Sequence, residues 1–173
     1  MQPVSSQYST QLAALKVLIV DDESTMRKVT RSLLQAINVK DVHEASDGSS
    51  GLEAICRLAP DVVLLDWSMP KLSGPDFVRH VRAPGTFPFP DVPIVMLTGH
   101  GERFRVMEAA RLGVNEFLLK PVSSTALLTR LVSILANPRR MVRKGDYYGP
   151  EPRKMASYKP EIDPALSQVV LIN

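Results

Sequence analysis

The chain has little of what marks secreted, membrane-spanning or disulfide-stapled proteins. Its 173 residues include one cysteine, Cys56, so no disulfide can form within the chain. No apolar run approaches the roughly 20 residues needed to cross a bilayer. Residues 1–11 lack the basic start and apolar centre of a signal peptide. These absences predict a cytoplasmic protein in a reducing compartment. Cys56 itself lies on an apolar helical face and is predicted to be buried and inert.

Positive charge is in excess only near the C-terminus. The net charge is +3, yet residues 1–136 carry fourteen acidic and fourteen basic side chains. Residues 137–173 carry seven basic and four acidic ones. The main part of the chain therefore shows no excess charge of the kind that binds nucleic acid.

Five predicted strands alternate with five patterns of helical spacing. The strands are 15–20, 42–45, 62–65, 94–97 and 114–119. The continuous apolar run 15–20 is typical of a strand buried on both faces of a parallel sheet. The helical patterns are 26–37 (with Ser24 placed as its cap), 52–58, 74–81, 102–112 and 123–136. The alternation predicts an α/β fold: a three-layer (βα)5 doubly wound parallel sheet.

The composition changes twice along the chain. Residues 1–14 are predicted to be a flexible N-terminal segment, and residues 15–136 form the α/β domain. From residue 137 onward prolines and basic residues become frequent, which predicts a basic, Pro-containing C-terminal extension over 137–173. Five prolines in 37 residues leave no room there for a DNA-binding domain.

Polar side chains follow four of the five predicted strands. They are Asp21 and Asp22, Asp66, Thr98, and Lys120. In parallel α/β sheets the carboxyl ends of the strands meet at one rim, so these side chains are expected to gather. Clustered carboxylates repel one another unless a cation joins them, and hard oxygen ligands suit Mg²⁺ or Mn²⁺. Lys120 and Thr98 would then serve an anion beside that metal, such as a phosphoryl group on a carboxylate.

Four motifs at these strand ends resemble those of a known family. They are VDDE, DWSMPKLSG, LTGH and FLLKP. With them, residues 15–136 resemble the CheY-like receiver domain of two-component response regulators, here as a single domain with a C-terminal extension. The resemblance implies a flavodoxin/CheY-like fold and a phosphorylation-driven conformational switch. It implies a phospho-acceptor that catalyses its own phosphotransfer and dephosphorylation, not a conventional enzyme.

The resemblance also assigns roles at the rim. Asp66 is the expected phospho-acceptor. A sensor histidine kinase or a histidine phosphotransfer protein is the expected phospho-donor. Asp22, Asp66 and the backbone carbonyl of Ser68 are the expected metal ligands, with Asp21 acting through a metal-bound water. Lys120 is expected to contact the phosphoryl oxygens.

Further roles concern switching and hydrolysis. The resemblance implies that Thr98 moves towards the phosphoryl group and that Phe117 occupies the aromatic switch position, although Phe lacks a hydroxyl. Ser68 and His100 are expected to tune dephosphorylation, and the peptide bond before Pro121 is expected to be cis.

The residues at the strand ends argue against two other functions and leave one alternative. A haloacid-dehalogenase-type phosphatase needs a second aspartate where Ser68 stands, and a nucleotide-binding α/β protein needs a Gly-rich loop where VDDES stands. A phosphorylation-independent receiver-like scaffold or interaction protein remains the alternative of a different class.

The last helical pattern has two apolar stripes and one charge, Arg130. The stripes are Leu127, Leu131 and Ile134, and Leu128, Val132 and Leu135. A second apolar face is expected to be buried against another surface. The apolar run 169–172 is expected to dock on the domain or on a neighbouring subunit. The pattern therefore predicts a homodimer through this helix and the C-terminal extension, with no membrane insertion and no direct DNA binding.

Overall fold

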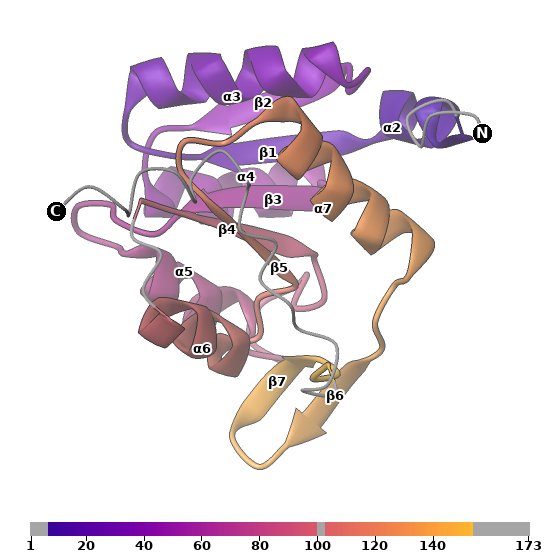
Figure 1. The fold of residues 1–173 in the computed structure, drawn as a ribbon. Helices are drawn as coiled ribbons and strands as arrows, with labels where there is room; N and C mark the ends of the chain where they lie inside the picture. Colours follow the sequence, from indigo (N-terminus) through magenta and orange to yellow (C-terminus); the bar gives the residue numbers. More distant parts are fainter. Residues whose placement is uncertain (1–6, 100–102, 154–173) are drawn as a thin grey trace, which may run out of the picture.

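A five-stranded parallel sheet forms the centre of the molecule. The structure, a computed structural model, describes residues 7–99 and 103–153. The strands are β1 (Lys16–Val20), β2 (Asp41–Ala45), β3 (Val62–Asp66), β4 (Ile94–Thr98) and β5 (Glu116–Leu119), in the order β2-β1-β3-β4-β5 (Figure 1). All four neighbouring pairs are parallel. The fold class predicted from the sequence is confirmed.

Helices cover both faces of this sheet. One face packs against α4 (Gly48–Leu58), α5 (Gly74–Val81) and α6 (Arg103–Leu112); the other packs against α2 (Ser9–Ala14), α3 (Ser24–Ala36) and α7 (Ser124–Ala136) (Figure 1). Successive strand residues point to opposite faces, so Leu18 and Val20 belong to the first core cluster and Val17 and Ile19 to the second. No helix among the described residues is long and apolar enough to span a bilayer.

The start of α3 differs from the prediction. Ser24 is the first helical residue and not the cap; Glu23 holds the cap position and makes no side-chain capping bond. The backbone N–H of Glu23 instead donates to Oδ1 of Asp21 at 2.8 Å. The aspartate that ends β1 therefore also organises the entry into α3.

Part of the predicted flexible N-terminal segment is ordered. Residues Ser9–Ala14 form α2, and Leu12 is fully buried in the second core cluster. The side-chain amide of Asn38 donates to the backbone O of Ser9 at 3.1 Å and to its Oγ at 2.9 Å. Leu12, with Tyr8 packed against the same cluster, and the amide of Asn38 thus anchor this segment.

The prediction that Cys56 is buried is wrong. Its side chain is exposed on α4, whereas Ala54 and Ile55 on the same helix face the core. Cys56 lies one step beyond Ile55, and at about 100° per residue that step carries it out of the buried stripe.

The C-terminal extension contains a β-hairpin that the sequence reasoning missed. Strands β6 (Met141–Lys144) and β7 (Tyr147–Pro150) pair antiparallel, with Lys144 opposite Tyr147. Gly145 occupies the turn with φ of +59°, a conformation that glycine adopts without strain. Gly-Asp between two short runs with branched and aromatic residues is a hairpin signal that would have predicted this turn.

The hairpin packs on the domain beside α6 (Figure 1). Gly149 lies directly against Gly113, the Tyr148 hydroxyl donates to Asp91, and Arg139 donates to the backbone O of Asn115. These contacts attach the extension to the amino-terminal end of the sheet, opposite the rim that carries the polar side chains.

Replacing Gly149 with alanine is expected to loosen the hairpin. The added Cβ would lie 2.6 Å from the Cα of Gly113, so one backbone must move. Overpacking of this kind costs about 1–3 kcal/mol. Thermal unfolding should show a lower midpoint, and limited trypsin digestion should cut faster after Arg143 or Lys144. The control is Gly145→Asn, because the turn has open space and Asn tolerates positive φ. Equal stability of Gly149→Ala and wild type would refute the packing.

Helix α7 is covered within its own domain more fully than predicted. Leu127 and Leu131 are fully buried, as expected, but Leu128 and Leu135 of the second stripe are half-buried against the second core cluster. Residues 169–172 lie outside the described residues. The homodimer therefore remains a prediction with less support than the sequence suggested.

Candidate functional site

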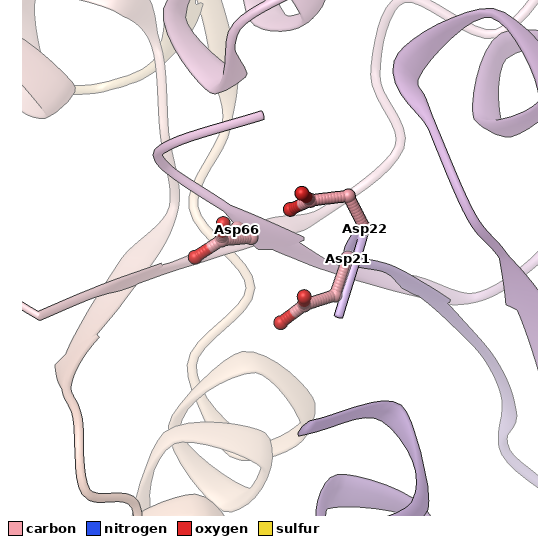
Figure 2. A group of neighbouring side chains, drawn as sticks. All are labelled: Asp21, Asp22 and Asp66. Carbon is pink, nitrogen blue, oxygen red and sulfur yellow. The ribbon is translucent and has the colours of Figure 1, made fainter. Parts of the chain in front are cut away.

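The rim at the carboxyl ends of the strands brings three carboxylates together. Asp21 and Asp22 directly follow β1, and Asp66 is the last residue of neighbouring β3. One carboxylate oxygen from each lies within 4.8 Å of the others, and Figure 2 shows the three side chains around a common space. Asp21 and Asp66 are buried, whereas Asp22 is exposed.

Lys120 reaches into this cluster from the end of β5. Its Nζ lies 2.7 Å from Oδ1 of Asp66 and 3.1 Å from Oδ2 of Asp21. The backbone N–H of Lys120 donates to the O of Thr98 at 2.8 Å, and the peptide bond to Pro121 is cis, as predicted. The ammonium thus bridges the two buried carboxylates.

The pKa values of the rim reflect this crowding. Burial raises the pKa of Asp66, and the charges of Asp21 and Asp22 raise it further, while the hydrogen bond and charge of Lys120 oppose the shift. Burial lowers the pKa of Lys120, but its bonds to Asp66 and Asp21 outweigh that effect and the net direction is upward. One ammonium among three carboxylates leaves an excess of negative charge.

The donor set fits a hard divalent cation. Carboxylate oxygens are the ligands that Mg²⁺ takes in proteins, and the excess negative charge favours its binding. Both oxygens of Asp21 already accept bonds, from the Glu23 N–H and from Lys120. Direct ligation by Asp22 and Asp66, with Asp21 acting through water, stays a prediction.

The loop after Asp66 is held close to the strand end. Gly74 donates its N–H to the O of Trp67 at 2.9 Å. A Cβ at Gly74 would lie 2.5 Å from the backbone O of Asp66, so only glycine fits there. Ser68 is exposed in this loop, two residues beyond Asp66. The start of α5 is thereby packed against the candidate acceptor.

Thr98 is fully buried at the end of β4, next to the strand that ends in Asp66. Its Oγ1 accepts from Nη1 of Arg105 at 3.5 Å, and the guanidinium carbon of Arg105 lies 5.3 Å from the centroid of the Trp67 ring. Arg105 was not predicted from the sequence, because a basic residue on a helix carries no signal of what it faces. Phe117 is half-buried and packs against the first core cluster. His100 lies outside the described residues.

In the absence of metal, Asp66→Asn is expected to stabilise the protein at neutral pH. The pKa of Asp66 is raised in the folded protein, so its contribution to stability is present below the unfolded pKa and is lost as pH rises through the folded pKa. The neutral variant avoids that loss. Its melting temperature in EDTA should therefore exceed that of wild type at pH 7. The difference should vanish near pH 3; a constant difference across pH would contradict this origin.

A doubly wound parallel sheet with an acidic cluster and a bridging lysine at its rim defines the class of receiver domains. Residues 17–132 match the response regulator receiver domain family, and the chain belongs to that family. The resemblance found in the sequence is confirmed.

Individual relatives cover the domain but leave part of this chain unmatched. Chemotaxis protein CheY1 of Helicobacter pylori J99 is 37% identical over 122 residues, which are 70% of this chain and 97% of that protein. Chemotaxis protein CheY-3 of Vibrio cholerae is 35% identical over 120 residues, 69% of this chain and 91% of that protein. A response regulator receiver domain protein from Clostridium thermocellum has a similar structure, with a TM-score of 0.63, 33% identity, and coverage of 70% of this chain and 94% of that one. The family match ends before the β6–β7 hairpin.

Proposed function

We propose that the protein is a response regulator whose Asp66 accepts a phosphoryl group, in a Mg²⁺-dependent reaction, from a sensor histidine kinase or a histidine phosphotransfer protein. The observation that carries this proposal is the buried carboxylate of Asp66, with the Lys120 ammonium at 2.7 Å and two further carboxylates within 4.8 Å. A buried carboxylate beside a fixed cation suits an acceptor whose product is more negative than the reactant.

The chemistry requires little of the protein beyond placement. An Asp66 oxygen attacks the phosphorus of phosphohistidine, a P–O bond forms and the P–N bond breaks. The imidazole nitrogen keeps the bonding electrons and takes up a proton from solvent, and Asp66 becomes an acyl phosphate. Lys120 lies where it can contact the transferred oxygens, and its raised pKa keeps it cationic at neutral pH.

Asp22, Asp66 and the backbone carbonyl of Ser68 would hold Mg²⁺ or Mn²⁺, with Asp21 acting through water. When bound, that metal supplies positive charge that offsets both the carboxylate repulsion and the phosphoryl charge. Asp21 contributes separately by fixing Lys120 and the start of α3.

The phosphorylated state would act through conformation and not through a catalytic output. Thr98, buried at the end of β4, would donate its hydroxyl to the phosphoryl group, with Phe117 responding from β5. Ser68 and His100 would tune hydrolysis of the acyl phosphate. The relatives named above are chemotaxis proteins, which supports a signalling role. The proposal places that role in the cytoplasm, with a protein target and no binding to DNA.

A phosphorylation-independent scaffold is the poorer alternative. Two buried carboxylates and a nearby exposed one repel each other, and this repulsion destabilises the fold. A protein that only binds a partner has no use for such a cluster, whereas a metal-dependent phospho-acceptor needs it.

Labelling with a phospho-donor tests the proposal. Purified protein is incubated with acetyl phosphate, or with a phosphorylated histidine kinase, and the acyl phosphate is quantified on phosphate-affinity gels. Label should require Mg²⁺ or Mn²⁺, disappear in EDTA, and disappear in Asp66→Asn. Asp76→Asn is the matched control, because Asp76 is a half-exposed aspartate on α5. Label that survives Asp66→Asn or chelation would overturn the assignment.

A further inference from the structure

Arg105 joins α6 to the ends of two neighbouring strands, β3 and β4. Its Nη1 lies 3.5 Å from Oγ1 of Thr98, the last residue of β4. Its guanidinium carbon lies 5.3 Å from the ring centroid of Trp67, the residue directly after Asp66. A single side chain of α6 therefore contacts the rim at two points.

We infer that Arg105 is a positioning residue that holds α6 to the rim while Asp66 carries no phosphoryl group. When Asp66 is phosphorylated, Arg105 loses its hydrogen bond to Thr98. This inference rests on the proposed function, since it requires a phosphoryl group on Asp66. It goes beyond the proposed function by stating that a guanidinium on α6 responds to the presence of that group.

The weakness of the Arg105–Thr98 contact makes it reversible. An N–O distance of 3.5 Å is at the long end of hydrogen bonding. A phosphoryl group brings up to two negative charges and three strong acceptor oxygens to the rim. Turning the Thr98 hydroxyl towards one of those oxygens moves Oγ1 and stretches its contact with Arg105 beyond hydrogen-bonding range. The long hydrogen bond that Nη1 of Arg105 donates to Oγ1 is too weak to hold the hydroxyl against that rotation.

The aromatic residue on β5 cannot make this polar connection. Phe117 has no hydroxyl and packs against the first core cluster. Arg105 has a charged, hydrogen-bonding head already at Thr98, so the position of the threonine is communicated to α6 by charge and hydrogen bonding and not by packing alone.

Trp67 provides a built-in reporter of the release. It is the only tryptophan in the chain. Arg105 and Trp67, with Ser68 and Glu108, line an open cavity of about 560 Å³ beside the rim. A guanidinium that moves relative to the indole changes both the surroundings of the ring and the shape of this cavity.

Hydrogen exchange of the α6 backbone tests the inference directly. In unphosphorylated protein, Arg105→Met is expected to speed exchange over residues 103–112 about fivefold, the factor produced by losing a contact of about 1 kcal/mol. Acetyl phosphate with Mg²⁺ should produce a similar increase in wild type and little further increase in the variant. Trp67 emission should follow the same pattern. Arg111→Met, an exposed arginine in the last turn of the same helix, is the control and should behave as wild type.

A double-mutant cycle separates this route from a general loosening of α6. Thr98→Val keeps the shape of the side chain and removes the hydroxyl, so it should reproduce the effect of Arg105→Met in unphosphorylated protein, and the two changes together should add little. Unchanged exchange in Arg105→Met, no effect of Thr98→Val, or full additivity would each overturn the inference. Wild-type protein that takes no label would instead defeat the proposed function, while the exchange of the unphosphorylated variants would still decide the role of Arg105.

Discussion

Replacing Lys120 with methionine is expected to slow phosphoryl transfer to Asp66 by about 10²–10³-fold, the loss that follows removal of one fixed donor from a site of developing negative charge. Among the described residues, Lys120 provides the one cationic nitrogen within 4.0 Å of Asp66. Methionine keeps the apolar stem and removes the charge, so packing at the end of β5 should change little. The rate is measured with acetyl phosphate and with a phosphorylated kinase at saturating Mg²⁺.

Two further measurements make this result specific. Mg²⁺ binding by Lys120→Met should be retained, because the cluster becomes more negative when the ammonium is removed. Lys40→Met, at an exposed position just before β2, should transfer at the wild-type rate. A Lys120→Met rate within twofold of wild type would show that the lysine is only a structural counter-ion.

Replacing Arg82 with methionine is expected to cost about 3 kcal/mol or more in the free energy of unfolding, and to lower the melting temperature by roughly 10 °C. Arg82 follows α5 and is buried; its guanidinium donates to the backbone O atoms of Gly113, Val92 and Pro90 and to Oδ1 of Asn115. Burial lowers its pKa to about 10, so it remains cationic at neutral pH. Methionine would leave buried carbonyls without a donor, and each such loss is costly.

Arg79→Met is the matched control for this experiment. Arg79 lies on α5 itself, but its side chain is 56% exposed and pairs only with Asp76, three residues earlier. An exposed ion pair of this kind contributes less than about 1 kcal/mol. In chemical denaturation, Arg82→Met should therefore unfold at a clearly lower denaturant concentration than Arg79→Met. Equal midpoints for the two variants would contradict the role assigned to Arg82.

The sheet and its rim could be predicted because the relevant signals are local and repeated. The three inner strands, β1, β3 and β4, are short apolar runs, as in Val62–Asp66, and parallel strands buried on both faces allow little else. The alternation with helices determines the parallel pairing, and that pairing brings residues such as Asp21, Asp66 and Lys120 to one edge. Local sequence and a general rule of topology are enough to place these groups together.

The features that were missed depend on contacts between distant segments. Arg82 looked like an ordinary basic residue at a helix end, yet its four acceptors lie 8 to 33 residues further along the chain. Arg105 is similar, because the role inferred for it depends on its contacts with Thr98 and Trp67. The hairpin did carry a local signal at Gly145, but the frequent prolines and charges of the whole extension 137–173 suggested a linker. Cys56 was misplaced by a single helical step.

The β6–β7 hairpin attaches at one end of the sheet, and the acidic cluster lies at the other end. Its contacts with Gly113, Asn115 and Asp91 lie at the amino ends of the strands, whereas Asp21, Asp66 and Lys120 lie at their carboxyl ends. A change in the length of the hairpin turn would therefore alter none of the contacts among these three side chains directly.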